Sequence, residues 1–324
     1  MKILVTGATG FVGSHLVKEL LARGHSVRIL RRTTSPLRMI EGLPVETIIG
    51  DVTERDSVQQ AVKGCQVVFH VAGHISFWSG NNALQTKINV QGTRHVVEAA
   101  LAAGTVERLI HTSSIAAIGI PDGIGDETLA YNWWPHHINY CNSKYLAEQE
   151  VQRGVKLGLN AVIVNPATIF GPGDLNLNAG AIVLQMKKGR IPFFIPGGCC
   201  TCDVADVVAG HIGAWEKGRT GERYILGGEN LTWKEIMLQV AEVIGVKPPQ
   251  RKIPTRLFSL MGHGSDIISH FTKKEPTLSR ESTLMAQFLY YFSSEKAKRE
   301  LGYRFIPFRE SAKRTHDWYF PKQS

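Results

Sequence analysis

Three glycines near the start of the chain place the strongest constraint on its fold. Gly7, Gly10 and Gly13 stand between an apolar run at residues 3–5 and an amphipathic stretch that begins at Phe11. Only a tight glycine turn joins a buried strand to a helix over so few residues. Such a turn points backbone N–H groups at the helix N-terminus towards an anion. The opening residues therefore predict a strand, a turn and a helix that bind a pyrophosphate.

Each glycine has an expected role in that turn. Gly7 allows the sharp bend, Gly10 lets a phosphate approach the backbone, and Gly13 lets the helix pack closely on the strand. The spacing is G-x-x-G-x-x-G rather than the commoner G-x-G-x-x-G, so the alternative is a turn that binds nothing. The flanking strand and helix favour a dinucleotide site formed by Gly7, Thr9, Gly10, Phe11, Val12 and Gly13.

Apolar segments of strand length alternate with helical patterns through the first half of the chain. Six such segments lie at 2–6, 26–30, 45–49, 66–71, 107–112 and 160–165, separated by periodic stretches such as 84–103. This alternation predicts an α/β fold with a doubly wound parallel sheet of the Rossmann type. Since ligands bind at the carboxyl ends of the strands of such a sheet, functional residues are expected just after each strand.

Beyond Pro166 the composition changes to connections rich in proline and glycine, such as G-P-G-D at 171–174 and I-P-G-G at 195–198. A chain of 324 residues exceeds one typical domain. We expect a dinucleotide-binding Rossmann domain at 1–165 and a smaller mixed α/β C-terminal substrate lobe at 166–324. Residues 203–226 are expected to return to the Rossmann sheet.

The overall composition disfavours several classes of protein. The chain is 43% hydrophobic and 20% charged, and its apolar runs are too short to cross a bilayer, so we expect a globular protein without a membrane span. The net charge of +9 is spread in runs of at most two basic residues, which argues against nucleic acid as a partner. The first strand begins at Lys2, so no secretory segment is expected.

The five cysteines argue against a disulfide framework, because their number is odd and they are scattered over a long chain. A reducing, cytoplasmic location fits better. Cys199, Cys200 and Cys202 are clustered, but they lack the paired C-x-x-C spacing of a zinc site. No metal is therefore expected.

The end of the second expected strand indicates which dinucleotide binds. Arg31 stands where an NAD-binding protein places an acidic residue against the ribose 2′-hydroxyl. A guanidinium there, with Arg32 beside it, favours the 2′-phosphate of NADP, although NAD stays possible. The alternative is a pair of solvated basic residues at a strand end. After the third strand, Asp51 and Val52 are expected to border the adenine.

The motif Y-C-N-S-K places Tyr140 and Lys144 four residues apart at the start of a helix expected to reach about residue 157. This spacing puts both side chains on one helix face. A phenol has a pKa near 10, so it needs nearby positive charge to exchange protons at neutral pH. Lys144 and an oxidised nicotinamide ring would supply that charge.

A third member of the site is expected from the end of the fifth strand, in H-T-S-S at 111–114. Ser114 is the preferred donor to polarise a substrate carbonyl, and Ser113 is the alternative, placed nearer the nicotinamide. The Y-x-x-x-K motif alone occurs by chance in many helices. A glycine turn, strand-end serines and a Tyr–Lys pair in this order favour an enzyme.

Several motifs together resemble the extended short-chain dehydrogenase/reductase family, part of the NAD-dependent epimerase/dehydratase superfamily. They are T-G-A-T-G-F-V-G, H-V-A-G, I-N-V-Q-G-T, H-T-S-S, Y-C-N-S-K and N-P-A-T-I-F-G-P-G-D, and the resemblance extends over almost the whole chain. Within the family the chain looks most similar to the dihydroflavonol-reductase-like branch. The segment R-Y-I-L-G-G-E-N-L-T resembles bacterial hopanoid-associated sugar epimerases.

The resemblance implies roles for individual residues. Tyr140 would be the general acid/base, Lys144 would hold the nicotinamide ribose and lower the tyrosine pKa, and Ser114 would polarise the carbonyl. Asn89 would support a proton relay. The adenosine side would be lined by V-A-G at Val71, Ala72 and Gly73, which departs from the family's usual N-A-A or H-A-A. The nicotinamide would be bordered by Pro166, Ala167 and Ile169.

Three functions compete: an NADPH-dependent reductase of a ketone or aldehyde, a nucleotide-sugar epimerase or dehydratase, and a dinucleotide sensor. A sensor need not keep the reactive Ser, Tyr and Lys. A dehydratase requires an acid and a base after the strand-five hydroxyl, but Ser114 is followed by I-A-A. Thr168 stands where related epimerases carry an asparagine for the nucleotide diphosphate. These two departures favour a reductase of hydrophobic carbonyl compounds.

Loops after the fourth and fifth strands are rich in aromatic residues. Such loops suit a ring-bearing or lipid-like substrate, and the alternative is that the tryptophans only pin a loop or bury the interface with the second lobe. The expected substrate residues are Phe77, Trp78, Trp133, Trp134 and Thr168.

The resemblance also implies a homodimer, paired through helices at about 84–103 and 140–157. The apolar segment 256–271 would either touch a membrane or cover the substrate. Covering is the favoured expectation, because glycines and an aspartate interrupt the membrane-lying face.

Overall fold

The computed structural model describes residues 1–177 and 179–321. Seven parallel strands form its main sheet, in the order β11-β7-β5-β4-β1-β2-β3. In chain order they are β1 (Lys2–Thr6), β2 (Ser26–Arg31), β3 (Glu46–Ile49), β4 (Val67–His70), β5 (Arg108–Thr112), β7 (Ala161–Pro166) and β11 (Arg223–Leu226). The strand order reverses between β1 and β4, so the topological switch point lies beside the glycine turn.

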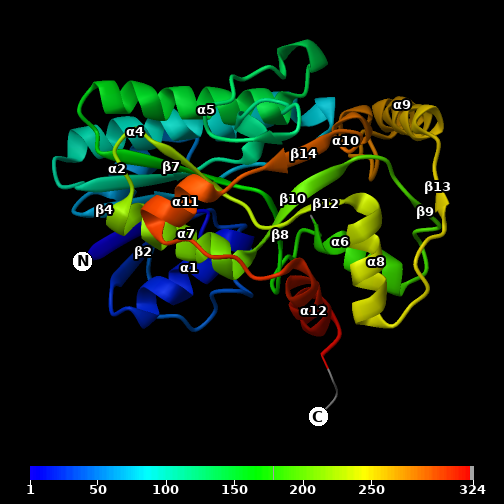
Figure 1. Ribbon diagram of the computed structural model, residues 1–324. Helices are drawn as coiled ribbons and strands as arrows, with labels where there is room; N and C mark the ends of the chain where they lie inside the picture. Colours follow the sequence, from blue (N-terminus) through cyan, green and yellow to red (C-terminus); the bar gives the residue numbers. More distant parts are fainter. Residues whose placement is uncertain (178, 322–324) are drawn as a thin grey trace.

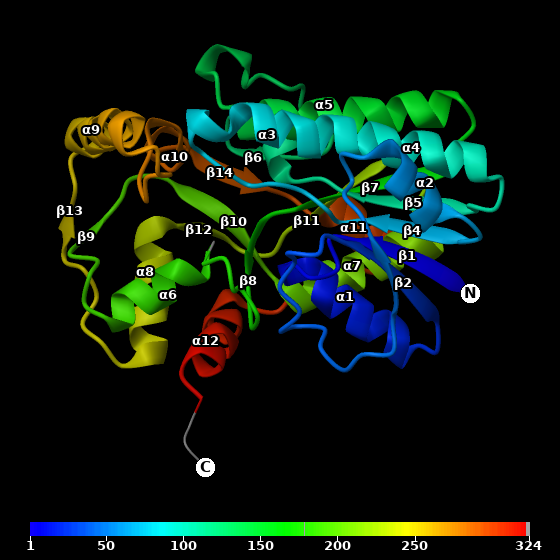
Figure 2. The ribbon, with the colours of Figure 1, turned by 180° about the vertical axis from the view of Figure 1, so that it is seen from behind.

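Helices cover both faces of this sheet, which is why strands such as β4 and β7 are buried along their whole length. A continuous helical stretch precedes β5. It consists of α3 (Asn82–Thr86), a π-helical turn (Lys87–Gln91) and α4 (Gly92–Ala103). On one face lie α1 (Phe11–Ala22) and α7 (Val204–Lys217); on the other lie α2 (Arg55–Val62), α3 (Asn82–Thr86), α4 (Gly92–Ala103) and α5 (Asn139–Lys156) (Figures 1 and 2).

The second lobe is built on a sheet of five short strands, with β12-β10-β14-β6 in order and β8 beside β10. These are β6 (Ile124–Gly125), β8 (Thr168–Phe170), β10 (Gly198–Asp203), β12 (Asn230–Thr232) and β14 (Leu289–Phe292), and a separate pair is formed by β9 (Phe193–Phe194) and β13 (Arg251–Lys252). The helices are α6 (Gly180–Lys187), α8 (Trp233–Ile244), α9 (Thr255–Thr272), α10 (Arg280–Met285) and α12 (Phe308–Tyr319), while α11 (Glu295–Leu301) lies against α7 and β11.

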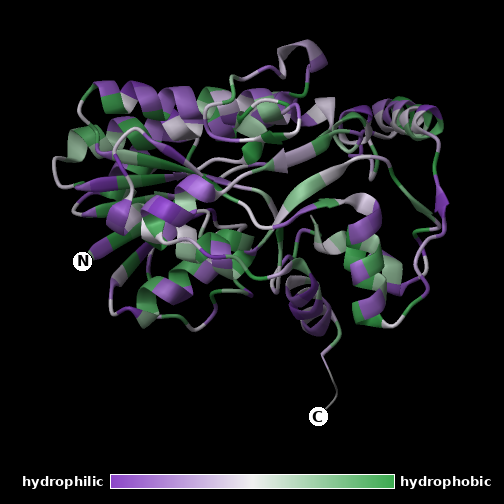
Figure 3. Cartoon of the chain, in the orientation of Figure 1, coloured by the Kyte–Doolittle hydropathy of each residue, from purple (hydrophilic) through white to green (hydrophobic). Residues whose placement is uncertain are grey.

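The lobe has its own apolar core beneath α6, α8 and α12. Phe170 and Phe308 meet edge to face in it, with ring centroids 4.9 Å apart. Phe308 is the first residue of α12, and the rest of this helix is largely hydrophilic, as Figure 3 shows. A single buried stripe therefore holds this helix to the lobe.

The expected α/β fold with a doubly wound parallel sheet is confirmed, and each of the six expected segments forms a strand of it. Residues 203–226 contribute α7 and the edge strand β11, which pairs with β7. Directly before them, β10 belongs to the sheet of the second lobe. The division into domains near residue 166 stays a prediction.

The cysteine cluster lies in β10, which is buried along its whole length. All five cysteines are buried and free, and burial raises the pKa of both Cys199 and Cys200 to about 12. Within residues 1–177 and 179–321, no three His, Cys, Asp or Glu side chains gather as a metal site. The same described ranges contain no helix long and apolar enough to cross a membrane.

Candidate active site

The glycine turn after β1 is shaped by two close backbone approaches. Gly7 has φ 69°, and a Cβ there would lie 2.6 Å from the nitrogen of Ala72. A Cβ on Gly13 would press on the Gly7 carbonyl and lie 2.9 Å from the Cα of Ala8. Only glycine fits at both positions. Gly7 therefore closes the turn against the loop after β4, and Gly13 seats the helix on the turn.

The N-terminus of α1 is open to an anion. Gly10 is its N-cap, with no side chain to accept a hydrogen bond from the first turn, and that turn carries no acidic residue. The Gly10 N–H donates to the Gly7 carbonyl at 3.0 Å, which fixes the bend. Thr9 and Phe11 lie half-buried beside it, and Val12 is buried in the core. These residues fit the pyrophosphate of a dinucleotide.

The ends of β2 and β3 carry the residues expected at the adenosine. Arg31 donates to the backbone carbonyl of Arg32 at 3.1 Å, and neither guanidinium forms an ion pair with any described residue. Asp51 Oδ1 accepts a hydrogen bond from the Thr53 N–H at 2.9 Å, so this carboxylate stabilises the loop in which it lies. Val52 is buried against α4. Two cations without an ion-pair partner among the described residues thus stand at the end of β2.

The loop after β4 joins the glycine turn to the expected catalytic residues. Ala72 packs on Gly7, as described above, and its N–H donates to Thr6 Oγ1 at 3.2 Å. At Gly73 a Cβ would lie 3.8 Å from Lys144 Nζ. Val71 is half-buried in the same loop. The V-A-G segment therefore lies between the two parts of the expected site.

Tyr140 lies in the first turn of α5 and is 8% exposed. The side chain of Ser114, which follows β5, lies close enough to the Tyr140 hydroxyl to affect its pKa. Burial raises the pKa of Tyr140 to about 12, and the nearby Ser114 side chain opposes that rise. The resemblance implies that Lys144 lowers this pKa; in the structure desolvation of the phenol is the largest cause and Lys144 is not among the groups that shift it.

Lys144 is buried one helical turn after Tyr140, and its ammonium donates to the Thr112 carbonyl at 2.7 Å. Burial lowers the pKa of Lys144 to about 8, and the negative charge of Glu148 opposes this. A lysine with a pKa so near neutrality is an unusual group for a structural role. Lys144 therefore lies at the carboxyl end of β5, where the loop that carries Ser114 begins.

Glu148 is a member of this region that the sequence analysis missed. It lies one turn beyond Lys144 and is 2% exposed. Its carboxylate accepts from Asn165 Nδ2 at 2.6 Å and pairs with Arg223 at 3.4 Å. Burial raises the pKa of Glu148, and the charge of Arg223 opposes the rise. The helical spacing 140, 144, 148 was the signal that would have revealed it.

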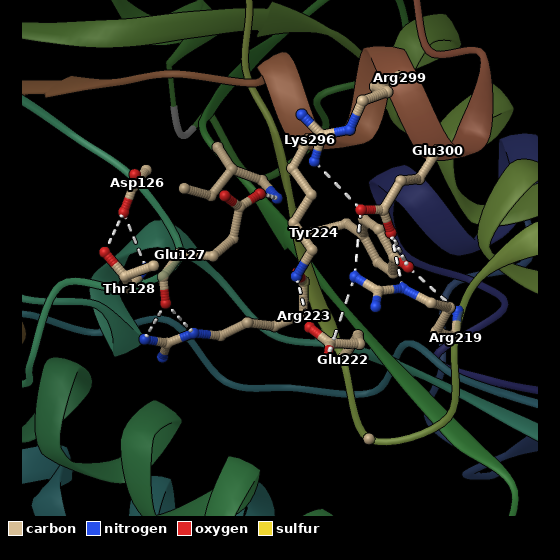
Figure 4. Close-up of polar contacts among 12 residues, drawn as sticks. Asp126, Glu127, Thr128, Arg219, Glu222, Arg223, Tyr224, Lys296, Arg299 and Glu300 are labelled. Atoms are coloured by element: carbon tan, nitrogen blue, oxygen red, sulfur yellow. Dashed lines mark hydrogen bonds and ion pairs between the residues drawn. The ribbon is translucent and has the colours of Figure 1, made fainter.

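Arg223 also holds the edge of the sheet. Its guanidinium donates to the Glu127 carbonyl at 2.6 and 2.9 Å, and the Glu127 carboxylate accepts from the Ile225 N–H at 2.9 Å (Figure 4). Nearby, Lys296 pairs with Glu222 at 2.6 Å. These charges line a hollow of about 820 Å³ and are paired with one another. The hollow is therefore a poor candidate for the substrate site.

Asn89 lies in the π-helical turn, a kind of distortion often found at functional sites. Its Oδ1 accepts from the His74 N–H at 2.8 Å, and its Nδ2 donates to the His74 carbonyl at 3.0 Å and to Ser143 Oγ at 2.9 Å. The amide thus clamps the loop after β4 to α5. This geometry indicates a positioning residue, and the relay role stays a prediction.

The aromatic residues expected at the substrate divide into two groups. Phe77 meets the Tyr140 ring edge to face, with centroids 5.3 Å apart, and Trp78 lies half-buried beside it in the loop. Trp133 is fully buried, and its indole N–H donates to the Tyr290 hydroxyl at 3.2 Å. Trp134 is exposed and packs on Tyr131 and Tyr145, away from Tyr140.

The two tryptophans therefore correct the sequence-based expectation. Trp133 joins the two lobes, as the alternative interpretation held, because Tyr290 belongs to β14 of the second lobe. Trp134 belongs to the surface beside the hollow that Tyr131 and Tyr145 line. Among the described residues, neither tryptophan makes a ring contact with Phe77 or Tyr140.

The remaining predicted residues lie at the ends of β5 and β7. The Ser113 N–H donates to the Val164 carbonyl at 2.8 Å, and its side chain is buried. Pro166 ends β7, and the Ala167 N–H donates to Leu226 at 3.1 Å. Thr168 and Ile169 are half-buried in β8, which pairs with β10. This stretch crosses from the main sheet to the second lobe at the expected nicotinamide position.

Comparisons with known proteins agree with this geometry. The model of the NAD dependent epimerase/dehydratase family matches residues 3–227. A Synechocystis sp. protein named "Putative dihydroflavonol 4-reductase" is 36% identical and covers 92% of this chain and 88% of its own length. Sterol demethylase protein B of Methylococcus capsulatus is 35% identical, covering 93% of each. The crystal structure of gox2253 is 39% identical with a TM-score of 0.85, covering 98% of this chain and 97% of that one. The similarity thus continues through the second lobe.

Proposed function

This chain belongs to the NAD-dependent epimerase/dehydratase family and is an NAD(P)-dependent oxidoreductase, and from that premise we propose that it interconverts an apolar ketone or aldehyde and its alcohol, using NADP. The observation that carries the proposal is that half-buried Ser114 lies close to Tyr140, and that Tyr140 and Lys144 are buried on one helix beside the aromatic ring of Phe77. When bound, the dinucleotide supplies or accepts the hydride.

Tyr140 exchanges the proton with the substrate oxygen. A phenol whose pKa is raised to about 12 keeps its proton at neutral pH, so it is ready to donate in the reducing direction. Ser114 lies beside the phenol and offers a second donor to a carbonyl oxygen. Both groups are therefore positioned before the substrate arrives.

Lys144 supplies positive charge and a proton close to the phenol. Its ammonium is fixed by the Thr112 carbonyl and lies beside Gly73, which carries no side chain that would block a ribose. Because burial lowers the pKa of Lys144 to about 8, it exchanges protons readily near neutral pH. It would hold the nicotinamide ribose and stabilise charge that develops on Tyr140.

The apolar character of the substrate is supported by the loop after β4, which places Phe77 against Tyr140 and Trp78 next to it. Aromatic walls bind flat rings well and gain little from a sugar diphosphate. The relatives named for dihydroflavonol and sterol chemistry act on ring systems by their names. We therefore expect a ring-bearing or lipid-like carbonyl compound.

NADP rather than NAD is the proposed cofactor, because Arg31 and Arg32 have no ion-pair partner among the described residues. A 2′-phosphate would pair with these guanidinium groups. We also propose that the enzyme acts as a cytoplasmic homodimer, paired through α4 and α5. Leu146 of α5 and Leu84 of α3 are exposed on that side and available to such an interface.

A nucleotide-sugar 4-epimerase is the second candidate, supported by the family to which the chain belongs. Thr168 weighs against it, because this short side chain lies in β8 where an epimerase of the family is expected to hold the diphosphate with an asparagine. A sensor without chemistry is disfavoured, because it need not keep the reactive Ser114, Tyr140 and Lys144.

The experiment that tests the proposal follows NADPH absorbance with four substrate groups: flavonoid ketones, steroid-like ketones, simple aldehydes and nucleotide sugars. Consumption of NADPH with a ring-bearing ketone supports the reductase. Conversion of nucleotide sugars alone, with no net change in NADPH, would establish the epimerase instead.

A further inference from the structure

Helix α9 carries a row of exposed apolar side chains along one side. Leu260, Ile267, Ile268 and Phe271 are 67%, 63%, 64% and 80% exposed, and Leu257 and Met261 are about half exposed. The positions 257, 260, 261, 267, 268 and 271 follow helical spacing, so they form one stripe. Figures 1 and 2 show α9 at the outer end of the second lobe, far from the N-terminus. We call these six residues the α9 stripe.

Two of the residues that interrupt the apolar sequence of α9, Gly262 and Asp266, lie on its inner side, whereas Gly264 faces open space. A Cβ on Gly262 would lie 2.7 Å from the Ser279 carbonyl, so this glycine lets α10 approach closely. Asp266 Oδ2 accepts from the Arg280 N–H at 3.0 Å, at the start of α10. Gly262 and Asp266 therefore face α10, and the apolar side of the helix faces outward. That the segment 256–271 covers the substrate stays a prediction.

Basic residues stand at both ends of the α9 stripe. Arg251, Lys252 and Arg256 are exposed before or at its start, and Lys273 and Lys274 are exposed just after its end. None of these five forms an ion pair with a described residue. An exposed apolar stripe bordered by free cations matches the charge and polarity of an anionic lipid surface.

We propose that α9 binds in the plane of a bilayer that contains anionic lipid. The six apolar side chains would enter the interface, and the five basic residues would contact lipid phosphates. A second copy of the chain is a poorer occupant, because pairing two stripes would bring two sets of free cations together. The net charge of +9 adds a favourable long-range field for an anionic surface.

The C-terminal end of α9 is tied to the candidate active site. Glu275, which follows the helix, accepts from Ser76 Oγ at 2.7 Å and from Asn81 Nδ2 at 2.9 Å. Ser76 precedes Phe77, whose ring contacts Tyr140. A bilayer under α9 would thus lie next to the loop that borders the site. The idea that an apolar substrate reaches the site from the lipid rests on the proposed function. The binding of α9 to the bilayer does not depend on that function.

The test measures co-sedimentation of the full chain with vesicles, without any substrate. Vesicles of phosphatidylcholine alone are compared with vesicles that hold about 30% phosphatidylglycerol. We expect binding to the anionic vesicles, and at least about a tenfold loss of partitioning in the double variant Ile267→Glu, Phe271→Glu. Leu238→Glu, at an exposed leucine of α8, is the matched control and should bind normally.

The role of the basic residues is tested separately with the double variant Lys273→Glu, Lys274→Glu. This variant should bind the anionic vesicles roughly tenfold more weakly. Lys188→Glu, at an exposed lysine in the same lobe, is its control. Equal binding by the α9 variants and their controls would overturn the proposal. The proposal would also be overturned if the Ile267→Glu, Phe271→Glu variant changed from dimer to monomer while its vesicle binding was unaffected. The α9 stripe would then be an interface between copies of the chain. Failure of every carbonyl substrate would leave the vesicle result intact.

Discussion

The ring of Phe77 meets the ring of Tyr140 edge to face, with centroids 5.3 Å apart. Phe77 comes from the loop after β4 and Tyr140 from α5, so this contact joins two separate parts of the chain at the Tyr140 phenol. The same loop is clamped by Asn89 to α5 and by Glu275 to the second lobe. The phenol therefore lies in a site whose wall is fixed at both ends.

Replacing Tyr140 with phenylalanine should remove the proton donor and leave the packing against Phe77 in place. We expect carbonyl reduction to fall by about 10²–10⁴-fold, the usual contribution of a general acid. Dinucleotide affinity, measured by fluorescence titration, should change little. Tyr145→Phe is the matched control, because Tyr145 lies on the same helix and stacks on Tyr131. Near-normal turnover in the Tyr140 variant would refute the catalytic assignment.

The pKa of Lys144 predicts how activity depends on pH. Burial lowers that pKa to about 8, so the ammonium is present below pH 8 and is lost as the pH rises through it. If the ammonium is required, kcat/KM should fall above about pH 8. Glu148→Gln removes the negative charge that raises the Lys144 pKa, so the fall should move to lower pH. The measurement is the pH profile of kcat/KM for both proteins.

The control for that profile is Glu150→Gln. Glu150 lies on the same helix but pairs with Arg94 and Arg153 on the surface. Its replacement should leave the alkaline limb of the profile where it was. An unchanged limb in Glu148→Gln would show that the Glu148 charge does not set the protonation of Lys144.

Arg31→Ala tests the choice of cofactor. A hydrogen bond to a charged group contributes about 1.5–3 kcal/mol, so NADPH should bind roughly ten- to a hundredfold more weakly. NADH affinity should stay nearly constant, because it lacks the 2′-phosphate. Arg55→Ala on α2 removes a similar charge away from the strand end and should have little effect. Tighter binding of NADH than NADPH by the unaltered protein would contradict the proposed specificity.

Local patterns were sufficient to predict the main sheet, the glycine turn and the Tyr140–Lys144 pair. Each of these depends on residues close in sequence: a strand and helix joined by Gly7 to Gly13, or two side chains four apart on α5. The alternation of strands and helices then indicates a parallel sheet, but it does not give the order of the seven strands. For this reason the fold class was predictable without any long-range contact.

Contacts between distant segments were not predictable in this way. The partner of Trp133 is Tyr290, in a strand of the other lobe, so nothing near Trp133 in the sequence shows that it is buried. The rise in the Tyr140 pKa likewise depends on desolvation by surrounding elements. For α9, the sequence shows Gly262 and Asp266 but not that both face α10.

Two glycines in helices should respond in opposite directions to replacement by alanine. At Gly13 the new methyl group would press on the Gly7 carbonyl, so we expect a loss of about 1–3 kcal/mol in the free energy of unfolding and a loss of dinucleotide affinity. At Gly264 of α9 a Cβ meets open space, so alanine should stabilise the protein by about 0.5–1 kcal/mol. Denaturant unfolding, with and without NADP, measures both effects. The Gly13→Ala protein could instead be as stable as the unaltered one and bind NADP with equal affinity. This result would mean that α1 can move away from the turn, and it would contradict the proposal that the pyrophosphate binds closely against this helix.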